Sequence, residues 1–432
     1  MNTAKNREQE LGDFVESQQE RLFTLLQDLV RIPSENRAPE GAEGACQAYM
    51  ARVLRGAGWE PRLYSLAEAQ GMESHPLYWP GRNYEGRPNL AAVRKGTGGG
   101  RSLILSGHVD TVPVGSAPWM RLPFGGQREG NRIYGRGAND MKAGIAANLF
   151  VAEALAERGI RLAGDLTFES VVDEEFGGVN GTLAGRLMGY GADAAIVSEP
   201  SFLRVCPAQR GGRTVQVTFR AVNEGILSSR RKALVIDQLR AFLDALPEFA
   251  ALRRHVAPRH VSYEHLEDPV PVTVTRIQTA PWGTSEPSNV PDTCRLELFW
   301  QTMPGETREE VDGQFAGWLE GLYGERADLF RERPQLEHPI RWLPGSAIQA
   351  ESPIVAELAA VAEATLGFRP EVAGIEGPCD LYVFHEFGIP AVLWGARGGN
   401  THMPDEYVEL DSLVQATKAL MAFVCSWCGE EL

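Results

Sequence analysis

Short apolar runs alternate with longer amphipathic segments in the first half of the chain and again toward its end. Glycine or polar residues bound the apolar runs, as they do buried strands, and these runs lie at 103–105, 166–172, 194–197 and 391–394. Helical periodicity occurs at 20–32, 46–54 and 143–157. Buried strands that alternate with helices predict an α/β domain with a mostly parallel sheet.

The middle of the chain has a different pattern. Alternating apolar and polar residues predict half-buried strands at 214–219, 270–277 and 295–302, and amphipathic helices are predicted at 231–246 and 309–322. Pro247 is expected to end the first of these helices. This order of elements suits a small α+β domain whose sheet has one covered face. We therefore expect an α/β domain of residues 1–208 and 327–432, interrupted by an α+β domain of residues 209–326.

Composition narrows the classes of function. The 432 residues include 42 Lys and Arg against 57 Asp and Glu, for a net charge of −15, which argues against a general nucleic-acid or anionic-membrane surface. No apolar stretch reaches the ~18 residues that span a bilayer, and residues 1–13 lack the apolar core of a signal peptide. We expect a cytoplasmic protein that binds neither nucleic acid nor membrane.

Cys425 and Cys428 form a C-x-x-C pair near the end of the chain. The second C-x-x-C that would complete a structural zinc site is absent. We expect both side chains to be ordinary reduced thiols.

Side chains of metal-binding types follow the predicted strands. They occur in the segments SGHVD at 106–110, GRGANDMK at 135–142, DEE at 173–175, SEP at 198–200 and GNTH at 399–402. Because ligands bind beyond the carboxyl ends of parallel strands, we expect these segments to converge. Each alone is typical of a turn, a cap or a solvated acidic pair, whereas their joint occurrence favours a paired divalent metal site. Two Zn²⁺ ions would be balanced by three carboxylates and a hydroxide, which can attack an unreactive amide.

These segments resemble motifs of the zinc-dependent amidohydrolase and peptidase family that contains acetylornithine deacetylase, succinyl-diaminopimelate desuccinylase, aminoacylase and bacterial glutamate carboxypeptidase. The motifs occur in order over nearly the whole chain: SGHVDTVPVG, YGRGANDMKAG, DEEFGG, SEPS, SNVPDTC and THMPDEYV. The resemblance implies a dizinc exopeptidase-like catalytic domain with a mostly parallel sheet. It also implies that the inserted α+β domain is a lid, which often forms the dimer interface in this family.

The resemblance assigns five metal ligands. His108, Asp140 and Glu199 would hold one zinc ion, and Asp140, Glu175 and His402 the other, so that Asp140 bridges the pair. Co²⁺ or Mn²⁺ could replace Zn²⁺, because carboxylate-rich sites accept these ions as well.

Two further catalytic residues follow from the same resemblance. The carboxylate of Asp110 would orient His108 by accepting its second ring N–H. Glu174 would be the general base that takes a proton from the metal-bound water and delivers it to the leaving amine. The peptide bond between Asn139 and Asp140 is expected to be cis, as it is in the family.

The lid departs from the family pattern at two positions. Leu227 stands where the family has a histidine that stabilises the oxyanion, and losing such a donor typically costs about 10²–10³ in rate. Gln301 stands where the family has an arginine that binds the substrate carboxylate, and a neutral amide cannot form that bidentate ion pair. The neighbouring substrate-binding residue of the family, Asn289, is retained.

Other residues could compensate for these changes. Arg397, just ahead of Gly398 and Gly399, could supply a replacement cation, although a surface arginine is an equally ordinary interpretation, and Gly399 is a candidate substrate-binding residue. A histidine from a nearby loop could replace the lid histidine, and the candidates are His255, His260 and His265.

The leading hypothesis is a dinuclear-zinc hydrolase that cleaves the amide bond of an N-acyl amino acid or a related N-acyl amine. A metallo-dipeptidase or carboxypeptidase is a second possibility. A divergent family member that binds metal without hydrolytic turnover is a third, because of Leu227 and Gln301. A homodimer through the lid is expected.

Overall fold

The computed structural model describes residues 2–222, 234–279 and 290–431. The chain forms two compact units. The larger unit contains residues 1–208, 347–375 and 379–432, and the smaller unit contains residues 209–346 and 376–378. The predicted return to the first domain at residue 327 is twenty residues too early, because strand β14 (Gln335–Glu337) pairs with β11 (Gly211–Arg220) of the smaller unit.

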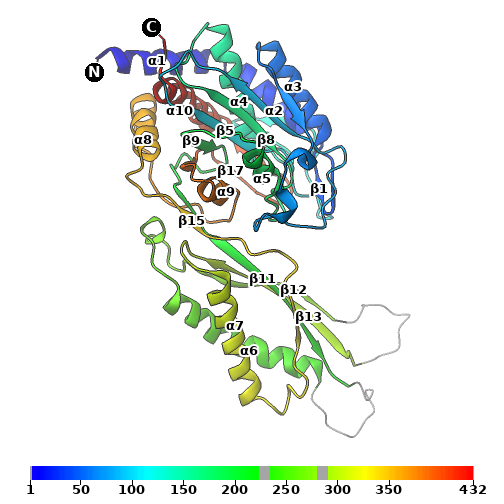
Figure 1. Ribbon diagram of the computed structural model, residues 1–432. Helices are drawn as coiled ribbons and strands as arrows, with labels where there is room; N and C mark the ends of the chain where they lie inside the picture. Colours follow the sequence, from blue (N-terminus) through cyan, green and yellow to red (C-terminus); the bar gives the residue numbers. More distant parts are fainter. Residues whose placement is uncertain (1, 223–233, 280–289, 432) are drawn as a thin grey trace. The chain divides into compact units, whose positions relative to one another are not determined.

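A six-stranded sheet forms the centre of the larger unit (Figure 1). Its strand order is β16 (Ala391–Leu393), β9 (Ala194–Val197), β5 (Leu103–His108), β8 (Leu166–Val171), β4 (Asn89–Arg94) and β3 (Arg62–Tyr64). The pairings from β16 to β8 are parallel, and β4 and β3 add antiparallel pairings at one edge. The predicted α/β class with a mostly parallel sheet is confirmed.

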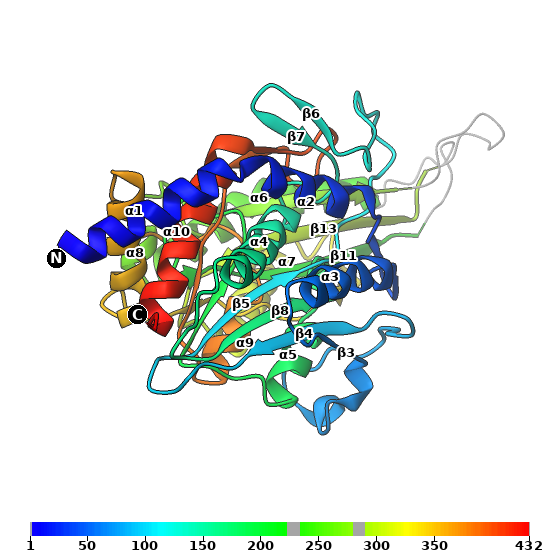
Figure 2. The same cartoon turned by 90° about the horizontal axis from the view of Figure 1, so that it is seen from above.

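Helices cover both faces of this sheet (Figures 1 and 2). Leu103 and Leu105 of β5 belong to the main core, whereas Ile104 between them packs with Leu381 and Phe384 of α9 on the opposite face. The helices of this unit are α1 (Asn2–Ser17), α2 (Gln19–Arg31), α3 (Gly44–Gly56), α4 (Lys142–Glu157), α5 (Asn180–Leu187), α8 (Pro353–Leu366), α9 (Leu381–Glu386) and α10 (Leu410–Cys428). Most side chains of α4 are buried, which explains its weakly amphipathic sequence.

Short strands complete the larger unit. They are β1 (Asn36–Arg37), β2 (Glu40–Gly41), β6 (Gln127–Glu129), β7 (Arg132–Tyr134), β17 (Gly398–Gly399) and β18 (Tyr407–Glu409). The last four form an antiparallel sheet in the order β17-β18-β7-β6, which joins the chain before α4 to the chain before α10. Strand β10 (Ala208–Gln209) pairs with β15 (Ser346–Ala347).

The smaller unit is an antiparallel sheet with two helices. Its strand order is β12 (Val272–Gln278), β13 (Thr293–Thr302), β11 and β14. Buried and partly exposed residues alternate along β13, and the buried ones pack with α6 (Val235–Val256) and α7 (Arg308–Glu325). The expected α+β arrangement of this part of the chain is therefore present.

Helix α6 continues through Pro247, so the prediction that this proline ends the helix is wrong. Phe249 and Arg253 lie beyond the proline and are fully buried. The ring of Phe249 packs edge-on against Trp300, with 5.3 Å between the ring centroids. Packing of this second half of the helix offsets the backbone hydrogen bond that proline removes.

No helix in the described ranges is long and apolar enough to cross a membrane. Cys425 and Cys428 lie in α10 and are buried, free cysteines.

Candidate metal centre

The carboxyl ends of three adjacent parallel strands carry the predicted metal-binding residues of the larger unit. His108 ends β5, Glu174 and Glu175 follow β8, and Glu199 follows β9. Asp140 precedes α4, and His402 lies in the loop between β17 and β18. Strand order explains why His108, Glu174, Glu175 and Glu199 meet at this edge, whereas the loop before α4 and the loop between β17 and β18 bring in Asp140 and His402.

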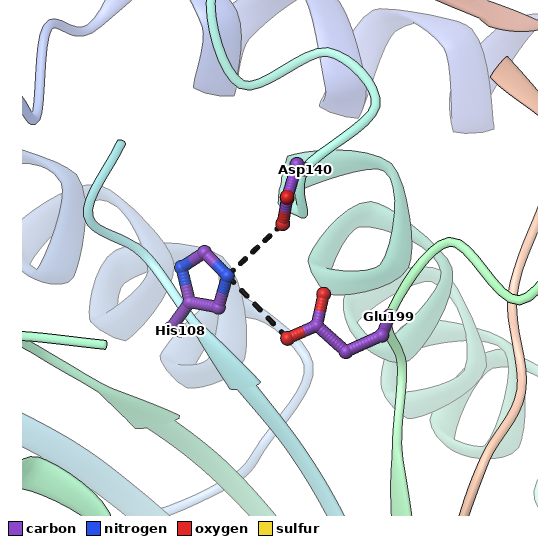
Figure 3. Close-up of side chains that lie close together, drawn as sticks. All are labelled: His108, Asp140 and Glu199. Atoms are coloured by element: carbon purple, nitrogen blue, oxygen red, sulfur yellow. Dashed lines mark hydrogen bonds and ion pairs between the residues drawn. The ribbon is translucent and has the colours of Figure 1, made fainter. Parts of the chain in front are cut away.

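His108, Asp140 and Glu199 form the first group (Figure 3). The Nε2 atom of His108 lies 3.1 Å from Oδ1 of Asp140 and 3.5 Å from Oε1 of Glu199. The potential ligand atoms all lie within 4.8 Å of one another. One imidazole and two carboxylates facing a common point are a ligand set that zinc and similar ions accept.

Asp140, Glu175 and His402 form the second group. The Nε2 atom of His402 lies 2.8 Å from Oε2 of Glu175 and 3.3 Å from Oδ2 of Asp140. Asp140 therefore directs Oδ1 to the first group and Oδ2 to the second. This is the arrangement that a carboxylate bridging two cations requires.

The tautomer of His108 follows from its second ring nitrogen. Nδ1 lies 2.9 Å from the backbone carbonyl oxygen of Asp110, which can only accept a hydrogen bond. Nδ1 therefore carries the proton, and the lone pair of Nε2 faces the site.

The expectation that the Asp110 carboxylate accepts this proton is not met, because its Oδ1 lies 3.7 Å from Nδ1. The carboxylate instead accepts the backbone N–H groups of Glu174 and Glu175, at 3.0 and 3.1 Å. Asp110 thus holds the turn that carries these two acids, while its backbone orients His108.

Glu406, which sequence reasoning did not single out, holds the turn that carries Asp140. Its buried carboxylate accepts the N–H groups of Gly137 at 3.1 Å, of Asn139 at 3.0 Å and of Asp140 at 3.0 Å. It also forms a 2.6 Å ion pair with the buried Arg136. The only signal in the sequence is that Arg136 and Glu406 lie within the motifs YGRGANDMKAG and THMPDEYV.

The peptide bond between Asp140 and Met141 is cis, so the prediction of a cis bond between Asn139 and Asp140 is wrong by one residue. The unusual bond follows Asp140. The bond before Asp140 instead carries the N–H group that Glu406 accepts.

The loop that presents His402 has an unusual backbone. Asn400, His402 and Asp405 all have positive φ angles, of 54°, 62° and 56°, which side chains other than glycine rarely adopt. Hydrogen bonds hold this conformation, because the side-chain amide of Asn400 donates to the carbonyls of Pro404 and Asp405. Strained backbone that persists in this way is concentrated at functional sites.

The buried groups of the site shift one another's pKa values. Burial and the nearby Asp140 raise the pKa of Glu175 to about 7 and the pKa of Glu199 well above its ordinary range. Burial opposes the charged form of His402, but Asp140 and Glu175 outweigh it and raise the pKa of His402 to about 11. Acids that repel one another in a buried cluster are stabilised by a cation placed among them.

Glu174 lies beside both groups. Its Oε2 atom is 3.8 Å from Nε2 of His108, and its side chain is 15% exposed. Burial, Asp380 and Glu199 raise the pKa of Glu174 well above its ordinary range, although His108 acts in the opposite direction. A carboxyl group with a raised pKa suits a residue that must accept a proton and later return it.

The donor set fits a pair of divalent cations. Two overlapping groups share one carboxylate, and together they offer two imidazoles and three carboxylates, the balance expected for two dications and one anion. Burial, together with repulsion from Asp140, raises the pKa values of Glu175 and Glu199, and a nearby cation would relieve both effects.

Arg397 and Gly399, two of the predicted substrate-binding residues, have other partners in the structure. The guanidinium of Arg397 lies 3.5 Å from the carboxylate of Glu409, so Arg397 already has an acidic partner. Gly399 pairs with Tyr407, and a Cβ atom there would lie 2.7 Å from the Tyr407 hydroxyl, which gives this glycine a packing role. Leu227 and Asn289 lie outside the described residues.

The remaining candidates belong to the smaller unit. The side-chain amide of Gln301 donates to the backbone carbonyl of Glu376. His260 accepts the N–H group of Ser262 and so caps a short 3₁₀ helix, Val261–Tyr263. His255 and His265 are exposed.

Residues 104–426 match the model of peptidase family M20/M25/M40. The chain belongs to this family. The predicted recognition and the predicted class of enzyme, a hydrolase of C–N amide bonds of the deacylase and peptidase type, are thereby confirmed.

Curated relatives of this M20 protein cover nearly its whole length. It is 29% identical to an N-formyl-4-amino-5-aminomethyl-2-methylpyrimidine deformylase of Halalkalibacterium halodurans, over 97% of both chains. A deformylase of the same name from Bacillus subtilis is 27% identical, over 96% of this chain and 97% of the relative. A succinyl-diaminopimelate desuccinylase of Rhodospirillum centenum is 27% identical, over 94% of this chain and 97% of the relative.

Solved structures confirm the fold. Human carnosine dipeptidase 1 superposes with a TM-score of 0.75 at 14% identity, over 98% of both chains. A dinuclear metal-binding M20 peptidase from Bacillus subtilis superposes with a TM-score of 0.63 at 16% identity, over 96% of this chain and 99% of that one.

Proposed function

We propose that this M20 protein is a dinuclear metal hydrolase that removes a short acyl group from an amine, with Glu174 as general base. The observation that carries the proposal is the pair of ligand groups that share Asp140, with the Glu174 carboxylate 3.8 Å from His108. The proposed ligands are His108, Asp140 and Glu199 for one ion, and Asp140, Glu175 and His402 for the other. Zinc is the proposed metal, and Co²⁺ or Mn²⁺ are alternatives.

The two cations, when bound, supply Lewis-acid activation of a water molecule and of the substrate carbonyl. The residues of the chain supply proton transfer and orientation. Glu174 accepts a proton at its carboxylate as the water attacks, and it then delivers this proton to the nitrogen of the leaving amine. Asp110 keeps Glu174 in place by accepting its backbone N–H group. The backbone carbonyl of Asp110 keeps the lone pair of His108 directed into the site.

The substrate that we propose is an N-acyl amine without a carboxylate beside the scissile bond. Two of the relatives carry the name of a deformylase whose substrate, as named, is a formylated aminomethyl-pyrimidine. Gln301, at the position of the family's carboxylate-binding arginine, is uncharged, and its amide group already donates to the carbonyl of Glu376. A neutral residue there suits a substrate that has no negative charge to be matched.

The test is the release of free amine from a matched panel of substrates. N-formyl, N-acetyl and N-succinyl groups would each be attached to an amine with and without an adjacent carboxylate, in the presence of Zn²⁺ or Co²⁺. We expect the highest kcat/KM for a short acyl group on an amine that lacks the carboxylate. Equal or better hydrolysis of the carboxylated members would refute the proposed substrate class.

The mechanism is tested with Glu174→Ala. Removing a general base typically lowers the rate by about 10²–10⁴. The bound metal measured by mass spectrometry should stay near that of the parent protein, because Glu174 belongs to neither ligand group. Unchanged turnover in this variant would refute its role.

Peptidase action remains a second candidate, since human carnosine dipeptidase 1 has the same fold. Hydrolysis of dipeptides with free and with amidated carboxyl ends distinguishes a peptidase from a deacylase. Turnover that needs the free carboxylate would favour the peptidase. Bound metal with no turnover over both panels would favour the third possibility, a family member without hydrolytic activity.

We also propose a homodimer formed through the smaller unit. Light scattering measures the mass of the full chain in solution and so tests this proposal. The same measurement on variants with substitutions in α6 and α7 tests the interface. A monomeric mass over the working concentration range would contradict it.

A further inference from the structure

Asp173 is a buried acid that directly precedes Glu174 and Glu175 in the sequence. Its side chain is fully buried, and its two oxygens accept hydrogen bonds from different parts of the chain. The hydroxyl of Tyr84 donates to Oδ2 at 2.6 Å, and the side-chain amide of Asn36 donates to Oδ1 at 3.0 Å. Arg82 and Arg87 each lie 3.7 Å away and balance its charge.

Asn36 connects this acid to the second buried acid behind the site. The same side-chain nitrogen that donates to Asp173 also donates to Oδ2 of Asp110, at 2.9 Å. An amide nitrogen carries two hydrogens, so Asn36 can serve both carboxylates at once. Asp110 in turn accepts the backbone N–H groups of Glu174 and Glu175. The turn with both acids is therefore attached to Asn36 at two points.

Tyr84 is itself held in place. The side-chain amide of Asn180 donates to the Tyr84 hydroxyl at 2.7 Å, which leaves the single hydroxyl proton for Asp173. Asn180 also accepts the N–H group of Trp79 at 3.0 Å and donates to its carbonyl at 2.7 Å. The segment between β3 and β4 thus contacts the turn through the hydrogen bond of the Tyr84 hydroxyl and through the ion pairs of Arg82 and Arg87.

The backbone of the turn needs such support. Asp173 has a φ angle of 66°, in the left-handed region that a residue with a side chain seldom occupies. A Cβ atom on Gly178 would lie 1.7 Å from the carbonyl oxygen of Asp173, so the chain folds back against this residue with no room to spare. A conformation of this kind persists where the surrounding contacts determine it.

We propose that Tyr84, Asn36 and Asp173 form a positioning network that fixes the turn with Glu174 and Glu175 at the metal centre. The inference rests on the proposed function for its effect on turnover, and on the ligand role of Glu175 for its effect on metal binding. The three residues act through the turn, so they are positioning residues. Loss of a contact in such an outer layer typically costs about 10–100-fold in metal affinity or activity.

The test compares two tyrosine hydroxyls of the same chemistry. Tyr84→Phe removes the hydrogen bond to Asp173. The control Tyr49→Phe removes a hydrogen bond away from the site, 3.2 Å from the Tyr49 hydroxyl of α3 to the partly exposed carboxylate of Asp28 on α2. The measurements are the dissociation constants for Co²⁺, from competition with a chelator of known affinity, the melting temperature without metal, and kcat and KM for the best substrate of the panel above.

We expect Tyr84→Phe to weaken the binding of one of the two Co²⁺ ions by about 10-fold or more, and to lower kcat more than it changes KM. Its metal-free melting temperature should lie within a few degrees of that of Tyr49→Phe, since the loss of one hydrogen bond to a buried acceptor shifts the melting temperature of a chain of this size by only a few degrees. Asn36→Asp replaces the shared donor with an acceptor and should have a larger effect on the same Co²⁺ constant.

Two results would overturn the proposal. One is Co²⁺ affinity and turnover in Tyr84→Phe equal to those of Tyr49→Phe. The other is a metal-free melting temperature that falls well below that of the control together with the affinity, because this would mark a merely structural contact. If no amide substrate is hydrolysed, the Co²⁺ constants still decide the network, while the proposed function alone fails.

Discussion

The buried ion pair between Glu406 and Arg136 offers a direct test of how the Asp140 turn is held. Glu406→Gln keeps the shape of the side chain but removes its charge and replaces one acceptor oxygen with a donor. The carboxylate accepts hydrogen bonds from three backbone N–H groups and from Arg136, whose side chain is 2% exposed. Removing one partner of a buried pair typically costs about 3–5 kcal/mol, because the other charge stays buried without a match.

A loss of that size would be a large fraction of the ~5–15 kcal/mol that stabilises a typical domain. Urea unfolding of the metal-free protein at pH 7, followed by circular dichroism, measures it. The exposed Glu60 gives the control, since Glu60→Gln should change the unfolding free energy by no more than about 0.5 kcal/mol. We further expect Arg136→Met combined with Glu406→Gln to cost less than the sum of the two single variants.

Either of two results would show that Glu406 and Arg136 do not hold this turn. One is a loss below about 1 kcal/mol in Glu406→Gln. The other is strict additivity with Arg136→Met, because two side chains that form one buried pair must show an energetic coupling.

Three further predictions concern metal binding, packing and thiol reactivity. Zn²⁺ or Co²⁺ at a free concentration 100 times its Kd should stabilise the fold by about 2.7 kcal/mol per site; calorimetry measures this, and no shift on addition of the ion would contradict the assigned ligands. Gly178→Ala should destabilise the protein, because the added Cβ atom would meet the carbonyl oxygen of Asp173. The control is Gly313→Ala in α7, where nothing lies near the added atom. In thermal unfolding we expect this control to be neutral or to stabilise the protein by up to about 1 kcal/mol. Burial raises the pKa of Cys425 and of Cys428 to about 12, so less thiolate is present at pH 8 than in the unfolded chain. We expect both thiols of the folded protein to react roughly 10³-fold more slowly with a thiol reagent than after unfolding. Rapid labelling of the native protein would contradict this expectation.

The central strands and the ligand residues could be predicted from the sequence because each has a local signal. The apolar runs at β5, β8 and β9 are bounded sharply, and metal-binding side chains follow them directly. Parallel strands then bring their ends to one edge of the sheet without further information. The family motifs supplied the pairing of residues as distant as Asp140 and His402.

The features that the sequence did not predict depend on tertiary contacts. Helix α6 passes Pro247 because residues on both sides of it are buried in one core. Strand β14 is a short, exposed edge strand whose place follows only from its pairing with β11. The choice between the carboxylate and the backbone carbonyl of Asp110 as partner of His108 is a matter of side-chain rotation, which no pattern along the chain encodes.

The sharing of Asp140 by the two proposed ligand groups has a consequence for how cations would be acquired during biosynthesis. A ribosome releases a chain at about 5–20 residues per second from its amino end, and the donors of the first group, His108, Asp140 and Glu199, all precede the smaller unit. The second group waits for His402, which is made after that unit. Glu406, which holds the turn of Asp140, is also made after that unit, so both groups would reach their final geometry only once translation has passed residue 406.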